Sequence, residues 1–444
     1  MLARTYIEKM KGILDTKRYS AIARYHYILA WEALCLNKLT LALDHAKTGL
    51  KITIEAEYPA LSVLLRTGVA DILTGLGRYE EARTYLKEAD RLSDRYRIGC
   101  LSYQVFWVEA LLHFDLGERK AGLEALKKCL RKSRELGIYG HSFWRTPVMM
   151  RLFAIALENG IEEERVHEII RRRRLVPDES MAEIENWPWP VKIYTLSKFA
   201  IVRDGKPLVF SRKVQKKTLE LLKALIALGG EDVRAEQVTD LLWPDADGDS
   251  AHNSFKMTVS RLRQLIGSDS VTYKEGRISI NNSSVWLDSS AFYRICEKVD
   301  TAWKRIKPLS DRDKDTKKRI EEAIALYEKG INMYKGIFLP DDTITWAISL
   351  RERLRGRFLK LISGLGEYYE QKGKLTTAVE VYLKGIEADN LREEFYQRLM
   401  LCYHKLGQQA EALNVYNLCK SELSSGLGIA PSKMTESILS TIKK

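Results

Sequence analysis

The sequence predicts a mainly α protein in which two arrays of paired helices flank a small α+β domain. Three observations support this prediction. One pattern of small residues repeats every 40 residues in the N-terminal third, another repeats every 34 residues near the C-terminus, and the stretch between them is rich in β-branched and aromatic residues. The chain of 444 residues is long enough for about three domains. Its hydrophobic content of 45% lets each of them bury a core.

The first array covers residues 1–175. Each copy is predicted to be a helix, a tight turn and a second helix, with a small residue five positions after the turn. Small residues let paired helices approach closely, and neighbouring pairs stack into a solenoid. We therefore expect this array to sense a peptide, a protein or a small molecule. The three copies are Leu36-Asn37 with Ala42, Leu76-Gly77 with Ala82, and Leu116-Gly117 with Gly122.

Residues 176–190 are a predicted linker, because they contain several prolines and end in Trp-Pro-Trp-Pro. The four arginines before them, residues 171–174, either contact phosphates or form a solvated helix end that the helix dipole favours. After Pro190, β-branched and aromatic residues are interrupted at Ser197-Lys198 and at Asp204-Gly205. This pattern predicts short antiparallel strands.

Two helices are predicted from Ser211 onward. The first stops at Gly229-Gly230 and the second is ended by Pro244. Their apolar residues at helical spacing are Leu219, Leu222 and Ile226 in the first helix, and Val238, Leu241 and Leu242 in the second. Four basic residues near the start of the first helix are either phosphate anchors or a solvated turn, namely Arg212, Lys213, Lys216 and Lys217.

A third helix carries the pattern that points to nucleic acid. It is predicted to start near Asp249 or Ser250, which are good N-caps, and to run to Gly267. Phe255, Val259, Leu262 and Ile266 form one stripe that faces the core. Cationic side chains on the opposite face can reach phosphates or guanine, and Asn, Ser and Gln can pair with bases. This polar face comprises Asn253, Lys256, Met257, Ser260, Arg261 and Gln264, with Arg263 at its edge.

The segment VTYKEGRISI follows the third helix and alternates around a Glu275-Gly276 turn. It predicts a two-stranded hairpin with Lys274 and Arg277 at its tip. An ordinary amphipathic surface helix would explain the apolar stripe but not this hairpin. Strands, three helices and a hairpin in this order form a winged helix-turn-helix, which we assign to residues 191–287. Its predicted partner is duplex DNA.

The second array covers residues 288–444. Gly373, Ala378 and Tyr382 recur 34 residues later as Gly407, Ala412 and Tyr416, and an earlier helix repeats the Ala-to-Tyr step at Ala323 and Tyr327. Two interpretations remain open for this array. It is either a groove for a peptide or protein, or a packing and dimerisation module without a ligand.

Several uncommon strings make the chain resemble known regulators. Residues 191–287 look like the OmpR-type winged helix, and FKMTVSRLRQLIG resembles its recognition helix. Residues 191–440 resemble regulators with a bacterial transcriptional activator domain, of the SARP type, through LLWPDAD, YKGIFLPDD and LGIAPSKMT. The N-terminal repeats resemble the tetratricopeptide arrays of MalT-like regulators. The predicted fold is therefore two tetratricopeptide-like arrays flanking a winged helix-turn-helix.

The resemblance implies roles for particular residues. Arg261 and its neighbours would enter the major groove, the wing around Arg277 would approach the minor groove, and the loop 243–250 would lie where family members meet RNA polymerase. The recognition helix of this family often opens with an arginine, and here that position holds Asn253. This departure puts one phosphate contact in doubt. RNA polymerase and a second copy of the chain are further expected partners.

Other functional classes find little support in the sequence. The net charge of +13 suits a polyanionic partner. We expect no enzyme activity, cofactor or metal site, because catalytic motifs are absent and the six cysteines are scattered. Without a long apolar run or a secretory signal, we expect a cytoplasmic protein with no membrane partner. The alternative function is a tetratricopeptide scaffold whose winged helix binds another protein.

Overall fold

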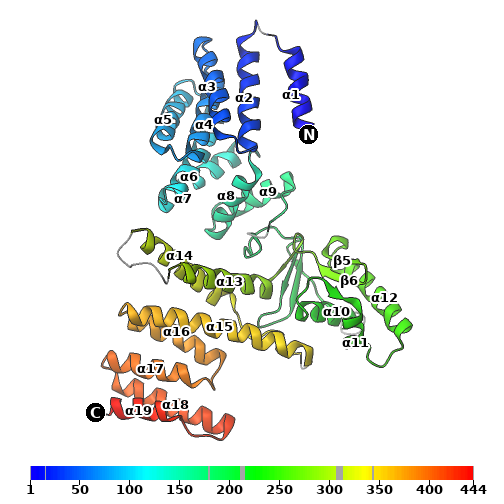
Figure 1. The fold of residues 1–444 in the computed structure, drawn as a ribbon, viewed down its shortest axis with the longest axis vertical. Helices are drawn as coiled ribbons and strands as arrows, with labels where there is room; N and C mark the ends of the chain where they lie inside the picture. Colours follow the sequence, from blue (N-terminus) through cyan, green and yellow to red (C-terminus); the bar gives the residue numbers. More distant parts are fainter. Residues whose placement is uncertain are drawn as a thin grey trace. The chain divides into compact units, whose positions relative to one another are not determined.

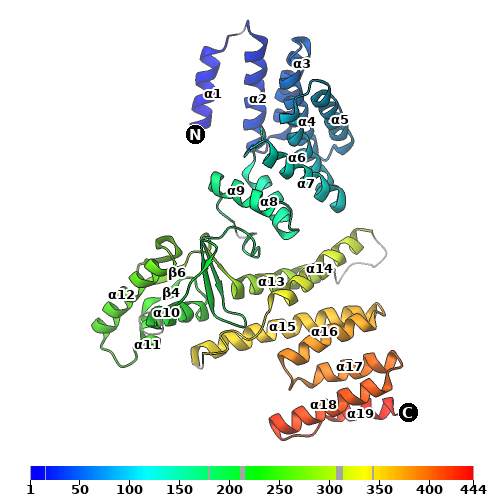
Figure 2. The ribbon, with the colours of Figure 1, turned by 180° about the vertical axis from the view of Figure 1, so that it is seen from behind.

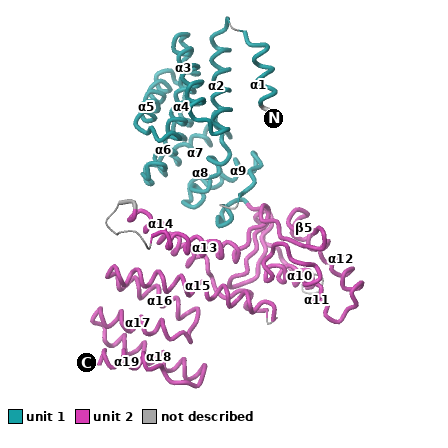
Figure 3. Tube along the Cα trace, in the orientation of Figure 1, with its two compact units in different colours: residues 1–188 teal, residues 189–444 magenta. Residues whose placement is uncertain are grey.

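The computed structural model describes residues 2–15, 17–178, 181–210, 216–306, 314–342 and 345–443. The chain divides into two compact units, residues 1–188 and 189–444 (Figure 3). This boundary falls inside the predicted linker. The described residues are mostly helical, which confirms the predicted fold class (Figure 1). None of the helices among these residues is long and apolar enough to span a bilayer.

The first unit begins with a regular array of equal helices. After α1 (Leu2–Ile13), six helices of 17 residues each start at intervals of 20 residues. Helix α2 packs on α3, α4 on α5, and α6 on α7. The six helices are α2 (Tyr19–Cys35), α3 (Leu39–Glu55), α4 (Pro59–Gly75), α5 (Tyr79–Arg95), α6 (Gly99–Asp115) and α7 (Arg119–Glu135).

The small residues of the predicted repeat lie where these helices touch. Ala42 and Ala82 are fully buried, and a Cβ atom on Gly122 would lie 2.8 Å from the Phe114 ring. The helix pairs recur every 40 residues, as predicted, and the single helices recur every 20 residues, because every helix ends in the same way. A residue with positive φ follows each helix, and the next backbone N–H bonds the carbonyl five residues earlier, as Arg78 does to Leu73. These positive-φ residues are Asn37, Glu57, Gly77, Arg97, Gly117 and Gly137.

The regular period fails after α7. It places the next helix start at residue 139, but α8 (Thr146–Glu158) begins seven residues later and is followed by α9 (Glu163–Arg173). The intervening residues 139–145 form neither helix nor strand, and we call them the strap. His141 and Phe143 of the strap are buried. The strap therefore belongs to the folded interior of the first unit.

The strap gives the first unit a pH-dependent stability. Burial lowers the pKa of His141 to about 3, and the nearby Arg145 acts in the same direction. The unfolded chain takes up this proton near pH 6.5 and the folded chain does not, so the free energy of unfolding falls as the pH drops below 6.5. We expect this loss to approach ~1.4 kcal/mol per pH unit. Urea unfolding of the full chain between pH 7 and 4 measures it, with His141→Gln as the control. Equal pH slopes for the two chains would refute the assignment.

The second unit opens with a four-stranded sheet in the order β3-β2-β1-β7. Strands β1 (Val191–Tyr194), β2 (Ala200–Arg203) and β3 (Lys206–Pro207) pair antiparallel, as predicted, with positive φ at Ser197 and Asp204 in the turns. Strand β7 (Val285–Leu287) pairs parallel to β1 and was not predicted. It returns the chain to this sheet at the end of the winged domain.

Three helices and a second sheet complete the winged domain (Figure 2). The helices are α10 (Lys216–Ala227), α11 (Ala235–Leu242) and α12 (Gly248–Ile266). The predicted hairpin is present as β5 (Val271–Lys274) and β6 (Arg277–Ile280). The prediction of only two strands was wrong, because β4 (Val233–Arg234) pairs with the other side of β6. Of the three apolar residues of the predicted second helix, α11 buries Val238 and Leu242, whereas Leu241 is exposed.

The C-terminal array comprises α13 to α19. Helix α13 packs on α14, α15 on α16, and α17 on α18, with α19 covering the last pair. The predicted repeat marks close contacts, since Cβ atoms on Gly364 and Gly366 would lie within 3.0 Å of Tyr327 and Tyr382. The helices are α13 (Asp288–Ile306), α14 (Lys314–Met333), α15 (Thr345–Gln371), α16 (Leu375–Ala388), α17 (Glu393–Lys405), α18 (Gln409–Leu427) and α19 (Lys433–Ile442).

The winged domain and the C-terminal array share one hydrophobic core, which runs from Val191 through Phe255 and Phe292 to Phe358. Two backbone hydrogen bonds strengthen this junction. Thr195 accepts a hydrogen bond from the Leu339 N–H at 2.9 Å, and the Ser197 N–H donates to Ile337 at 3.0 Å. The proposed division at residue 287 is therefore not a packing boundary.

Candidate nucleic-acid interface

Helix α12 is held firmly against the rest of the winged domain. Its four predicted core residues, Phe255, Val259, Leu262 and Ile266, are buried. The Phe255 ring packs edge-on against Tyr273 of the wing at 5.3 Å between centroids. The helix begins at Gly248, and the capping residue is Asp247, whose Oδ1 accepts a hydrogen bond from the Ser250 N–H at 2.8 Å. The predicted start at Asp249 or Ser250 was thus late by one or two residues.

The opposite face of α12 is exposed, and its side chains are available to bind a partner. Six side chains at a spacing of three or four residues lie on it, and two of them are cationic. Within the described part of the chain, none of the six makes a hydrogen bond or an ion pair through its side chain. This set, which we call the α12 face, comprises Asn253, Lys256, Met257, Ser260, Arg261 and Gln264.

Arg263 does not belong to the α12 face. Its side chain is half-buried, and its Nε donates a hydrogen bond to the Val271 carbonyl at 3.0 Å. This contact joins the last turn of α12 to strand β5. Arg203 supports the same end of the helix, because its Nη1 donates to the carbonyls of Gln264 and Leu265. The contact with Val271 gives Arg263 a positioning role at the end of the helix, and its predicted place at the edge of a DNA-facing surface stays a prediction.

The wing carries three basic side chains. Lys274 and Arg277 flank the Glu275-Gly276 turn as predicted, and both turn residues have positive φ. Arg277 is not free, because its Nη1 lies 2.6 Å from the Asp232 carboxylate. Arg234 lies beside Arg277 in the pairing of β4 with β6 and is exposed. The sequence analysis missed Arg234, since a two-residue strand leaves no periodic signal.

The predicted basic cluster before α10 is only partly described. Arg212 and Lys213 lie outside the described residues. Lys216 is exposed at the start of α10. Lys217 instead donates to the Leu242 carbonyl at 2.8 Å and pairs with Glu220 at 3.0 Å. Lys216 therefore remains available for a phosphate, whereas Lys217 joins α10 to the end of α11.

The loop between α11 and α12 is acidic. Asp245, Asp247 and Asp249 are exposed around the start of α12. Carboxylates repel DNA phosphates, so any approach of DNA is favoured at the middle and the C-terminal half of the helix. Lys256, Arg261 and Gln264 lie in that part of the α12 face.

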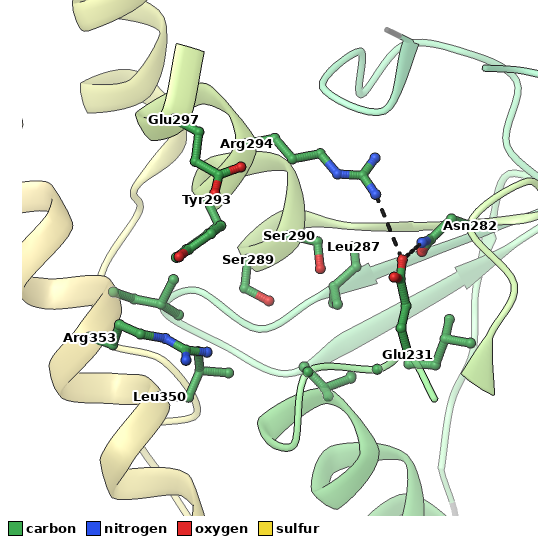
Figure 4. Close-up of a pocket in the computed structure, with 15 residues that line it drawn as sticks. Glu231, Asn282, Leu287, Ser289, Ser290, Tyr293, Arg294, Glu297, Leu350 and Arg353 are labelled. Atoms are coloured by element: carbon green, nitrogen blue, oxygen red, sulfur yellow. Dashed lines mark hydrogen bonds and ion pairs between the residues drawn. The ribbon is translucent and has the colours of Figure 1, made fainter. Parts of the chain in front are cut away.

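The second unit also contains a cavity of about 370 Å³ between the end of α10, α13 and α15 (Figure 4). Its charged lining is balanced. Glu231 lies 4.0 Å from Arg294, and the guanidinium of Arg353 lies 5.7 Å from the centre of the Tyr293 ring. With Glu297 as the fourth charged residue, the lining has no net charge and does not favour an anion such as a phosphate.

Comparisons with known proteins identify two regions of the chain. Residues 305–443 match the bacterial transcriptional activator domain, and residues 66–96 match a tetratricopeptide repeat. Both predicted features are therefore confirmed. The OmpR-type assignment of residues 191–287 stays a prediction.

Among curated proteins, the chain is 26% identical over 227 residues to the regulatory protein AfsR of Streptomyces griseus. It is 24% identical over 229 residues to the AfsR of Streptomyces coelicolor. These matches cover 51% and 52% of the chain, which spans only 22% of the length of each relative.

Among solved structures, EmbR of Mycobacterium tuberculosis in complex with a low affinity phosphopeptide is 18% identical. That match covers 57% of this chain and 65% of EmbR, with a TM-score of 0.44. The apo form of RapI is 13% identical, with coverage of 80% and 90% and a TM-score of 0.31.

Proposed function

We propose that this chain is a bacterial transcriptional regulator that binds duplex promoter DNA through α12 and the wing. The observation that carries the proposal is the α12 face, a row of exposed and mostly polar or cationic side chains that form no hydrogen bond or ion pair within the described chain. A major groove about 12 Å wide admits such a helix. The activator-domain match and the regulatory relatives support the same function.

Each polar residue then has a role. Arg261 pairs with a guanine edge or a phosphate, and Asn253, Ser260 and Gln264 offer hydrogen bonds to bases. Lys256 and Lys216 neutralise phosphates. The basic residues of the wing, Lys274 with Arg277 and Arg234, approach the neighbouring backbone or minor groove.

The flanking regions take the remaining roles. We assign residues 1–175 to the sensory array, 176–190 to the connection, 191–287 to DNA binding and 288–444 to the activator array. The acidic segment 243–250 and the activator array are the surfaces that we expect to meet RNA polymerase or a second copy. The alternative function is a tetratricopeptide scaffold. It gives no reason for exposed cationic side chains on α12 that have no partner within the described chain.

The experiment that tests this function is the salt dependence of binding to duplex DNA. About six described basic side chains are placed for phosphate contact, and that number makes affinity fall roughly a thousand-fold between 50 and 200 mM salt. Fluorescence anisotropy with a labelled promoter-length duplex measures the fall. Absence of binding at 50 mM, or an affinity that does not change with salt, would favour the scaffold.

Lys256→Ala should weaken binding to every duplex by a similar factor. The lysine supplies one charge to the backbone and no sequence readout, so the slope of log affinity against log salt should decrease by about 1. Lys384→Ala is a matched control, because Lys384 is an exposed lysine on α16 of the same unit. A variant that changes the preferred sequence but not the salt slope would show that Lys256 contacts a base.

A further inference from the structure

The strap, residues 139–145, lies across the face that the first helices of the three pairs present. We call the sides of α2, α4 and α6 that contact the strap the first-helix face. The strap begins at α6, crosses α4 and reaches α2, which are neighbours in the array. In helical-repeat proteins such a face is the usual surface for binding an extended partner.

Helices α2 and α6 hold the backbone of the strap. The Tyr103 hydroxyl on α6 donates to the Gly140 carbonyl, and the Tyr27 hydroxyl on α2 donates to the Ser142 carbonyl. Trp31 Nε1 on α2 donates to the Trp144 carbonyl at 2.9 Å. Three alternate carbonyls are thus held by side chains of the array, a pattern that depends little on the sequence of the bound segment.

Helix α4 recognises two side chains of the strap. The Phe143 ring fills a notch at Gly68, where a Cβ atom would lie 2.2 Å from the ring. The guanidinium of Arg145 forms an ion pair with Asp71, whose side chain is only 3% exposed. Gly68 and Asp71 lie three residues apart and therefore on one face of α4. Together they select an aromatic residue followed two positions later by an arginine.

The fit between strap and array is incomplete. Two buried polar atoms of α6 at this contact have no hydrogen-bond partner in the described part of the chain, namely Gln104 Oε1 and Trp107 Nε1. A buried polar atom without a partner costs free energy. A segment that satisfied these atoms would therefore bind this face more tightly than the strap itself.

We propose that the first-helix face is a peptide-binding site, that the strap is its internal ligand, and that a partner protein displaces it with a Phe-x-Arg segment. The site does not depend on the proposed DNA binding. It supplies the input that the N-terminal array senses. When the strap is bound, Phe143 fills the notch at Gly68 and Arg145 pairs with Asp71. The partner competes for both positions.

The test uses the full chain and a fluorescein-labelled peptide with the strap sequence Tyr-Gly-His-Ser-Phe-Trp-Arg. Replacing residues 139–145 by seven Gly and Ser residues empties the face. We expect this chain to bind the peptide at least ten-fold more tightly than the unmodified chain in fluorescence anisotropy. Asp71→Asn in the replaced chain, or a peptide with Gln in place of Arg, should abolish the gain.

A replaced chain that keeps its helical circular dichroism but gains no peptide binding would overturn the proposal. If that chain instead loses its helical signal, the Arg145→Ala variant of the unmodified chain tests the proposal. This substitution removes only the ion pair between the strap and Asp71. Peptide binding by Arg145→Ala above the level of the unmodified chain supports displacement. Equal binding would show that the strap is a fixed part of the core.

Discussion

Arg261→Ala is expected to weaken binding of the preferred duplex by about 1–3 kcal/mol, or roughly ten-fold to more than a hundred-fold. Arg261 is exposed in the middle of the α12 face and has no hydrogen bond or ion pair within the described chain. Its removal therefore costs contacts with DNA and not contacts within the fold. Anisotropy titration with the preferred duplex and with a scrambled duplex measures the effect.

Two controls separate recognition from folding in this experiment. Lys384→Ala removes one exposed charge from the C-terminal array and should leave affinity nearly unchanged. Arg263→Ala breaks the bond to Val271 and should lower stability by about 1 kcal/mol. If Arg261→Ala keeps full affinity for the preferred duplex, or loses stability as Arg263→Ala does, then Arg261 is not a DNA contact.

Asp288→Ala is expected to destabilise the second unit by about 2–5 kcal/mol. Asp288 is buried, and its Oδ2 accepts hydrogen bonds from the backbone N–H groups of Thr195 and Leu196 at 2.7 and 2.8 Å. Its Oδ1 accepts from the Thr195 hydroxyl at 2.6 Å and from the Ser289 N–H at 2.7 Å. Alanine leaves the buried donors that follow β1 without a partner. The carboxylate thus fastens the winged domain to the first helix of the activator array.

Equilibrium urea unfolding of the full chain measures this loss. Asp288→Asn keeps the size of the side chain and one acceptor oxygen, so it should cost less than Asp288→Ala. A loss below about 1 kcal/mol for Asp288→Ala would mean that water or another donor arrangement replaces the carboxylate. Equal losses for the two variants would mean that charge, and not the number of acceptors, holds the junction.

The α12 face could be predicted because α12 is long and its pattern is local. Nineteen residues contain enough turns for the buried stripe and the polar face to separate clearly. The start of the helix was predicted one or two residues late, because Asp247, Asp249 and Ser250 are all residue types that can cap a helix. The role of Arg263 depends on strand β5, so its contact with Val271 left no trace in the helical pattern.

Features set by distant pairing could not be predicted. Strands β4 and β7 have two and three residues, and only their partners β6 and β1 make them strands. The 20-residue spacing of the single helices was hidden because Glu57 and Arg97 occupy turn positions where the other helices have asparagine or glycine. The strap was missed for a similar reason. Its contacts join residues that are far apart in the chain, such as Tyr27 and Ser142.

Selection of bound sequences from a random duplex library tests the central proposal most directly. The unmodified chain should enrich one motif, and two copies at a spacing of about one helical turn would reveal binding as a dimer. A variant with Lys256→Ala and Arg261→Ala together should keep its fold and lose the enrichment. Failure of the unmodified chain to enrich any sequence, or enrichment of the same motif by the double variant, would contradict DNA recognition by α12.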